Sequence, residues 1–442
     1  MLTSTHLLRQ RRFLPLFATQ LLNAFNDNLF KNAMVLFVVY GVYNSEKAEA
    51  QFSALCSGLF ILPFFILSAL AGQLADMRDK AMIIRWVKLA EIGIMVVGAA
   101  GLLLAWSGHL TTAVAIPLML VALFAMGVHS TFFGPIKYAI LPQHLQKNEV
   151  LAGTGLVEAG TYIAILGGTI LAGWIPVQWA AVGIVVTAIV GYLTSRSVPP
   201  APPTVAGEPI DPHIIRASIA LVRNTMHQAE VYYAILAISF FWTIGAVLFI
   251  QFPPLAKNVL LAQKEVASLF LVVFSVGVAI GSVAVNALLK GRVSARYAPA
   301  SVLAMGGFVA LFYLVCRIWA ATVTGDLMDV PTFLSHPMAF AVLASLLMIA
   351  VSGGMFVVPL YAFLTTKVDP GQAARTVAAN NIVNSGAMVA GSLLAAALSW
   401  IGVAPVEQVL LSAAMCLFSA WLGWMLYQAE KSAALTAAMP AE

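Results

Sequence analysis

The chain has 442 residues, of which 61% are hydrophobic and 9% are charged, and its net charge is +5. Soluble globular proteins carry about 25% charged residues, so this composition excludes a soluble domain and indicates an integral membrane protein. The apolar stretches are continuous rather than alternating, which also excludes an outer-membrane barrel.

Long apolar stretches recur along the whole chain. About 20 apolar residues span a bilayer as a helix. On that measure we predict an all-α integral membrane protein with twelve transmembrane helices, near 13–40, 52–75, 81–106, 112–140, 149–174, 178–195, 230–252, 266–289, 298–320, 338–363, 374–400 and 404–427.

The first span carries an unusual polar stripe. Gln20, Asn23, Asp27 and Lys31 follow one another at spacings of 3, 4 and 4, so they share one helical face. A carboxylate at the bilayer centre costs at least about 2.5–3.5 kcal/mol, so Asp27 should face a polar interior or a partner. We therefore predict that this face, with the adjacent Asn28, lines a pathway through the membrane.

The loop after the second span and the third span contain further charges. Asp76, Arg78 and Lys80 follow the second span, and we expect them to latch one conformation rather than to contact substrate. In the third span Lys88 and Glu91 lie three residues apart and can pair. This pair is either part of the pathway or an ion pair that fixes helix packing.

The fourth and fifth spans each contain one charged candidate. Lys137 follows Pro135, which removes a helix hydrogen bond and favours a hinge, although Lys137 is also near enough to the span end to extend towards water. His129 lies eight residues before Lys137 and could line the same cavity, although a lone histidine between apolar neighbours is more typical of a satisfied core residue. Glu158 has no basic neighbour in its own helix, so we predict that it also lies on the pathway.

A proline-rich segment, 197–212, divides the spans six and six. We predict an N-terminal bundle at 1–196, a cytoplasmic linker with an interfacial helix at 197–229, and a C-terminal bundle at 230–442. A shift of 226 residues sets Glu158 on Asn384, which favours a duplicated six-helix unit and makes Asn384 a further candidate.

Basic residues gather in alternate loops. One side carries most of them, and the positive-inside rule places that side and both termini in the cytoplasm. They are Arg9, Arg11, Arg12, Arg78, Lys80, Lys147, Arg196, Arg216, Arg223, Lys290, Arg292, Arg296 and Lys367, against Lys47, Lys257 and Lys264 on the other side. The positive charge thus follows topology, and we expect no nucleic-acid partner. Cys56, Cys316 and Cys416 lie in separate spans and are expected to be small buried hydrophobes.

Four segments carry a family resemblance: NAFNDN, KLAEIG, GPIKYAIL and LAGTGLVEAGTYIAILGG, all within residues 13–175. They resemble the lysophospholipid transporter family of bacterial inner membranes, a branch of the major facilitator superfamily whose transporter is fused to an acyltransferase in some members. The loop after the second span is an imperfect copy of the superfamily's motif.

The resemblance implies the major facilitator fold, with two pseudo-symmetric six-helix bundles rocking about a central cavity. It implies inward movement of lysophospholipids, chiefly lysophosphatidylethanolamine, for re-acylation by a cytoplasmic acyltransferase. The family's charged residues fall on Asp27, Lys88, Glu91, Lys137 and Glu158. A zwitterionic headgroup needs carboxylates for its amine and a cation for its phosphate, so Asp27 and Glu158 suit the amine, and Lys88 or Lys137 suits the phosphate.

Three other functions compete with lipid transport. A proton- or sodium-coupled exporter of drugs or other amphiphiles would use Asp27 and Glu158 as titrating groups, and a scaffold or receptor would transport nothing. An acyltransferase would need an Asp four residues after a His, and none of the seven histidines has one. A Walker loop for ATP is also absent, and we expect that the chain is not an enzyme. The three cysteines lack the spacing of metal ligands, and we expect neither a metal nor a cofactor.

Overall fold

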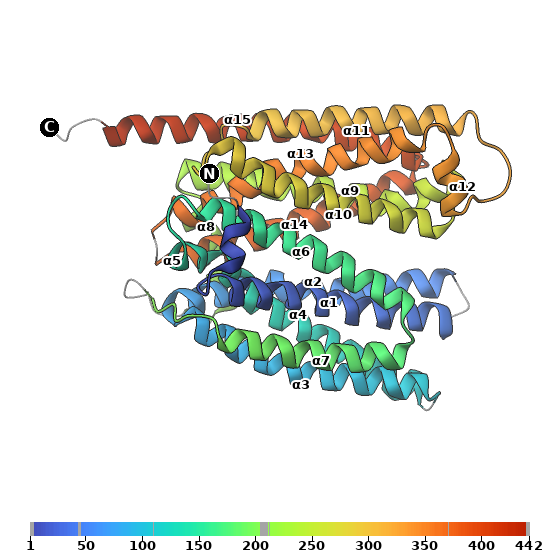
Figure 1. Cartoon of the computed structure of the whole chain (residues 1–442), viewed down its shortest axis with the longest axis horizontal. Helices are drawn as coiled ribbons and strands as arrows, with labels where there is room; N and C mark the ends of the chain where they lie inside the picture. Colours follow the sequence, from blue (N-terminus) through green and yellow to red (C-terminus); the bar gives the residue numbers. More distant parts are fainter. Residues whose placement is uncertain are drawn as a thin grey trace. The chain divides into compact units, whose positions relative to one another are not determined.

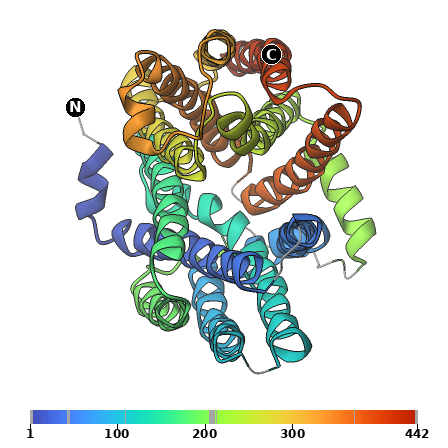
Figure 2. The same cartoon turned by 90° about the vertical axis from the view of Figure 1, so that its right-hand side faces the viewer.

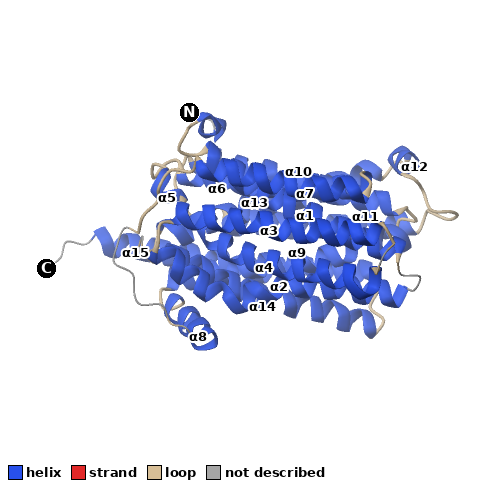
Figure 3. Ribbon diagram, turned by 90° about the horizontal axis from the view of Figure 1, so that it is seen from below, coloured by secondary structure: helices blue, strands red, loops and turns tan. Residues whose placement is uncertain are grey.

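A computed structural model describes residues 4–42, 46–108, 110–203, 211, 213–369 and 371–438. Regular structure in these ranges is helical, apart from one isolated bridge between Ala262 and Met328 (Figure 3). Half of the proline-rich segment, 204–210 and 212, lies outside the described residues.

The chain forms two compact units. Unit 1 comprises 1–153, 160–224 and 368–382, and unit 2 comprises 154–159, 225–367 and 383–442 (Figure 1). Helices of the first half are η1 (Ser4–Arg9), α1 (Leu14–Gly41), α2 (Glu46–Met77), α3 (Lys80–Trp106), η2 (Thr111–Ala115), α4 (Ile116–Ala139), α5 (Leu141–His144), α6 (Val150–Trp174), α7 (Val177–Arg196) and α8 (Ile214–Thr225). Those of the second half are α9 (Ala229–Asn258), α10 (Lys264–Leu289), α11 (Ala298–Ala320), α12 (Val330–Ser335), α13 (Ala339–Thr366), α14 (Ala373–Trp400) and α15 (Pro405–Ala438).

Eleven helices of the described chain are long and apolar enough to cross a membrane. They correspond to eleven of the twelve predicted spans. The remaining predicted span is α1, which is 28 residues long but whose amide and charged side chains reduce its hydropathy. A helix of that length still reaches across a bilayer if its polar face is covered by neighbouring helices.

The two units repeat one packing scheme. In unit 1, α1 packs on α7, α2 on α4, and α3 on both α4 and α7. In unit 2, α9 packs on α15, α10 on α13, and α11 on both α13 and α15 (Figure 2). Each pair in the first unit has its equivalent in the second, as expected for two pseudo-symmetric bundles.

Local sequence fixes where several helices begin and end. The Asp79 carboxylate accepts hydrogen bonds from the backbone N–H groups of Ala81 and Met82, so it caps the start of α3. At the end of α7, the run of prolines after Val198 cannot continue a helix.

The short helix α8 is separate from α9, so it is not an extension of the seventh span. It lies at the same end of unit 1 as α5 (Figures 1 and 3). Ala217 packs against Ala69 of α2, while Ile215 and Ile219 are exposed. Before the helix, hydrogen bonds from the Arg216 guanidinium lower the pKa of the Asp211 carboxyl to about 2.

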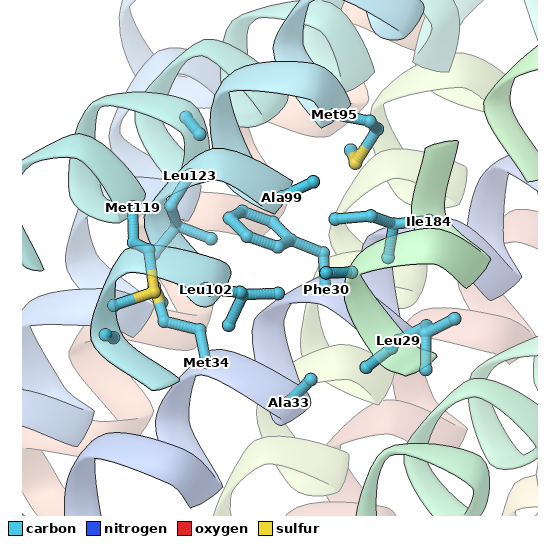
Figure 4. Packing of buried hydrophobic residues seen from close by; sticks show 14 of the residues in the cluster. Leu29, Phe30, Ala33, Met34, Met95, Ala99, Leu102, Met119, Leu123 and Ile184 are labelled. Carbon is cyan, nitrogen blue, oxygen red and sulfur yellow. The ribbon is translucent and has the colours of Figure 1, made fainter. Parts of the chain in front are cut away.

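An apolar core lies next to the polar stripe in unit 1. Phe30 of α1 is its centre and packs among side chains of α3, α4 and α7 (Figure 4). In a bilayer such contacts stabilise the fold by close packing rather than by removal from water. This core holds α1 in the rotation that turns its polar face towards α3 and α4. The three cysteines are buried and free, as predicted.

Candidate functional site, a buried polar cluster in unit 1

The polar face of α1 is buried inside unit 1. Gln20, Asn23 and Asp27 are each less than a tenth exposed. The amide of Asn23 donates to Asp27 Oδ2 over 3.2 Å, which is the contact expected of two residues one turn apart on the same face. Of the predicted stripe, Asn23 and Asp27 are thus joined directly by a hydrogen bond.

On α3, Lys88 and Glu91 form a salt bridge and are fully buried. Asn26 of α1 donates to Glu91 Oε1 over 2.7 Å, and His129 of α4 places its Nε2 3.4 Å from Glu91 Oε2. The Lys88 ammonium also lies 3.4 Å from Asn23 Oδ1, which joins the pair to the α1 stripe. The predicted i,i+3 pair is thus part of a larger polar cluster, which we define as Asn23, Asn26, Asp27, Lys88, Glu91, His129 and Ser130.

A glycine of α7 makes room for the buried lysine. A Cβ atom on Gly191 would lie 2.8 Å from Lys88 Cε, closer than real Cβ contacts allow. Any larger residue there would displace the lysine side chain and with it the ion pair.

Two contacts set the register of α1 against α4. The Ser130 hydroxyl donates to Asp27 Oδ2 over 2.7 Å, and the Gln20 amide donates to the Lys137 carbonyl over 3.0 Å. The earlier residue of α1, Gln20, contacts the later residue of α4, Lys137, and the later residue of α1, Asp27, contacts the earlier Ser130. The two helices therefore run antiparallel at this point. Ser130 and Lys137 are two turns apart on one face of α4, and both face α1.

The two carboxylates of the cluster differ in their partners. Glu91 has a lysine, an amide and an imidazole around it, so its charge is matched within the cluster. Asp27 accepts only from the neutral groups of Ser130 and Asn23, and its Oδ1 atom has no hydrogen-bond partner among the described residues. No described basic side chain lies within ion-pair distance of Asp27. Its free oxygen is therefore able to accept a hydrogen bond from a cation or an amine.

Three predicted residues of unit 1 lie outside this cluster. Lys31 is half-buried with its ammonium 5.6 Å from the centre of the Phe60 ring. Lys137 is half-buried with its ammonium over the ring of its neighbour Tyr138. Asn28 donates to the Ala24 carbonyl of its own helix.

Sequence reasoning omitted Asn26 and Ser130 and treated His129 as a core residue. His129 is indeed buried, but its ring faces Glu91 and it belongs to the cluster. The sequence signal that could have identified these residues is a polar side chain within an apolar span. Asn26 directly precedes Asp27, and Ser130 directly follows His129.

The three predicted latch residues, Asp76, Arg78 and Lys80, lie in different environments within unit 1. The Asp76 carboxylate accepts hydrogen bonds from the backbone N–H groups of Ala374 and Arg375, at the start of α14. It thus stabilises the N-terminus of α14, where backbone N–H groups lack partners within the helix. Lys80 is buried and its backbone N–H donates to the Ala201 carbonyl, whereas Arg78 is exposed.

The remaining candidates belong to unit 2. Glu158 lies in the short segment of α6 that groups with this unit, and it is buried. Asn384 of α14 is also buried, and its Oδ1 atom has no hydrogen-bond partner within the described part of the chain.

Solved structures similar to this chain share its fold. The human organic anion transporter MFSD10 matches with a TM-score of 0.73 and 14% identity, covering 93% of this chain and 99% of that one. A bacterial homologue of the iron transporter ferroportin, in an outward-facing state, matches with a TM-score of 0.70 and 12% identity, covering 96% and 100%.

The relatives found by sequence similarity are named for one class of substrate, the lysophospholipids. A lysophospholipid transporter, LplT, of Serratia proteamaculans is 26% identical over 81% of this chain and 80% of its own length. The LplT of Salmonella newport is 23% identical over 85% of each chain. The family model described as Major Facilitator Superfamily matches residues 16–392. The chain is therefore a membrane transporter that belongs to the Major Facilitator Superfamily, and it resembles the LplT transporters within it.

Proposed function

We propose that the chain is a secondary transporter that moves lysophospholipids, chiefly lysophosphatidylethanolamine, inward across the bacterial inner membrane by alternating access. The observation that carries this proposal is the buried Asp27 carboxylate, with one oxygen partnered by neutral groups and the other unpartnered among the described residues. A carboxylate at mid-span with no described basic side chain within ion-pair distance is expensive, so its retention is explained if a transported cation or amine supplies that partner. The names of the two LplT relatives support a lysophospholipid as the molecule that carries the amine.

The headgroup then binds along the face between α1 and α4. Its ammonium donates to Asp27 Oδ1 as a charge-assisted hydrogen bond. Its phosphate pairs with a lysine, and Lys137 is the better choice, because Glu91 already occupies Lys88. Lys137 is half-buried, faces no carboxylate within ion-pair distance among the described residues, and lies about two turns from Ser130 on the same face of α4. Glu158 is a further proposed contact, to be tested separately by Glu158→Gln.

Inward movement delivers the lipid to the cytoplasmic leaflet, where an acyltransferase can restore its second chain. The proton- or sodium-coupled exporter remains the competing function, because a buried carboxylate with a free oxygen also suits a coupling ion.

Uptake of fluorescent lysophosphatidylethanolamine into proteoliposomes tests the proposal. The protein is compared with Asp27→Asn and with Asp326→Asn, which neutralises an exposed carboxylate in a loop of unit 2. We expect saturable uptake by the native chain and by Asp326→Asn, and a loss of about tenfold or more in Asp27→Asn, because a hydrogen bond to a charged group contributes about 1.5–3 kcal/mol.

Lysophosphatidylglycerol, which lacks the amine, separates the role of Asp27 from the function itself. If Asp27 binds the amine, Asp27→Asn should reduce uptake of the ethanolamine lipid more than uptake of the glycerol lipid. Equal losses would reject that role but leave lipid transport standing. No uptake of either lipid by folded native protein, together with gradient-dependent export of amphiphiles, would favour the exporter.

A further inference from the structure

A groove runs along the side of unit 1 between α2, α3 and α4. Its volume is about 630 Å³, within the roughly 300–1,000 Å³ of small-molecule sites. Apolar side chains form nearly all of its lining, among them Trp86, Ala90 and Ile94 of α3 and Phe124 and Phe132 of α4. Only His129 belongs both to the lining of this groove and to the polar cluster described above.

The groove has the length of one lipid leaflet. Along α3 it extends from Met82 to Ile94, which corresponds to roughly 18 Å at 1.5 Å per residue. Half of a hydrocarbon core is about 15 Å thick. Trp86 is 67% exposed on a membrane-spanning helix, so the medium that reaches this groove is the acyl-chain region of the bilayer.

The two ends of the groove are chemically different. Arg78, just beyond the end of α2, lies at one end and is exposed, and no described carboxylate lies within ion-pair distance of it. Ile94 and Phe124 close the other end, deep in the span. The groove therefore places a guanidinium at the level of the headgroups and apolar side chains below it. This arrangement complements a phosphate that is attached to an acyl chain.

The wall of the groove also touches the polar cluster. His129 lines the groove, and the same ring lies 3.4 Å from Glu91. An occupant of the groove is therefore one side chain away from the Lys88–Glu91 pair.

We propose that this groove binds one acyl chain of an anionic phospholipid, with the lipid phosphate on Arg78. The lipid belongs to the leaflet that surrounds the turn between α2 and α3, and it is bound as a resident of the site. The proposal goes beyond lysophospholipid transport and does not depend on it.

Photo-crosslinking in nanodiscs tests this site. The probe is phosphatidylglycerol with a diazirine on one acyl chain, diluted into phosphatidylcholine, and adducts are located by peptide mass spectrometry. The full chain is compared with Arg78→Gln, with Ala90→Trp, which fills the groove, and with Ala100→Trp. Ala100 is an exposed alanine of the same helix outside the groove, so it is the matched control.

We expect adducts concentrated in residues 82–94 and 124–132 of the native chain and of Ala100→Trp. Ala90→Trp should remove them while labelling of unit 2 helices persists, which also shows that the variant is folded. Arg78→Gln should reduce them about tenfold, the loss expected for one charge-assisted contact.

Two results would overturn the proposal. Labelling that is equal for phosphatidylglycerol and phosphatidylcholine probes and indifferent to Ala90→Trp would show only non-selective surrounding lipid. Labelling that Ala90→Trp removes and Arg78→Gln leaves intact would reject an anionic headgroup at Arg78. Because binding is measured without transport, failure of the lipid-uptake assay would leave this test unaffected.

Discussion

Lys88 and Glu91 lie one turn apart on α3 with no exposure to solvent, so each depends on the other for its counter-charge. Their spacing predicted the pair, because i,i+3 residues of a helix are neighbours. The contacts that the polar cluster makes between helices were beyond the reach of that argument. Asn26 is 65 residues before Glu91, and Ser130 is 103 residues after the Asp27 that it contacts.

Neutralising one member of the pair should therefore be worse than neutralising both. Glu91→Gln leaves a buried ammonium without its counter-charge, and breaking a buried pair in this way costs about 3–5 kcal/mol. We expect a clear fall in the thermal unfolding temperature in detergent. The double variant Lys88→Met, Glu91→Gln should recover a large part of that loss.

The exposed Asp326→Asn is the control for a change of one charge, and it should unfold at the native temperature. A Glu91→Gln protein as stable as the native chain would contradict the proposed dependence of Lys88 on Glu91.

Close contacts between helices are made at glycines. Gly281 of α10 has the Val351 backbone of α13 directly over it, with no space for a side chain. In unit 1, Gly191 similarly accommodates Lys88. Small residues at such positions let membrane helices approach closely. The sequence alone does not say which glycine faces which helix.

Gly281→Ala should loosen the packing of α10 on α13. Overpacking typically costs about 1–3 kcal/mol, so we expect a lower unfolding temperature. Gly307 of α11 has nothing within 4 Å of an added Cβ, so Gly307→Ala is the matched control. That variant should be as stable as the native chain or slightly more so, since alanine favours a helix by about 1 kcal/mol over glycine. An equal loss in both variants would show that the backbone contact at Gly281 does not limit stability.

At the scale of the whole molecule, the basic residues predict which loops face the cytoplasm. Lys147, after α5, belongs to the predicted cytoplasmic set, and Lys257, near the end of α9, to the opposite set. Both are exposed, and the three native cysteines are buried. Single cysteines at the two lysines therefore report their side of the membrane above a low background.

In intact spheroplasts, a membrane-impermeant maleimide should label Lys257→Cys at once. Lys147→Cys should be labelled only after the membrane is permeabilised. The reverse pattern would mean that the termini face away from the cytoplasm and that the proposed inward direction of transport has to be revised.

Composition and hydrophobicity determined the class of protein and its helical architecture, and the proline-rich segment at 197–212 predicted a division into two six-helix units. They could do so because a bilayer requires every backbone hydrogen bond to be made within a helix, so length and apolarity alone identify a span. The stripe on α1 was predictable for the same reason, as it depends only on the 3.6-residue period.

Tertiary structure alone decided what the stripe faces. Helix rotation and the antiparallel register of α1 and α4 bring Ser130 to Asp27, give Glu91 its amide and imidazole partners, and leave Lys137 outside the cluster. The groove beside Trp86 is likewise lined by side chains that α2, α3 and α4 bring together. Such contacts join residues far apart in sequence, and their geometry depends on packing that no local period encodes.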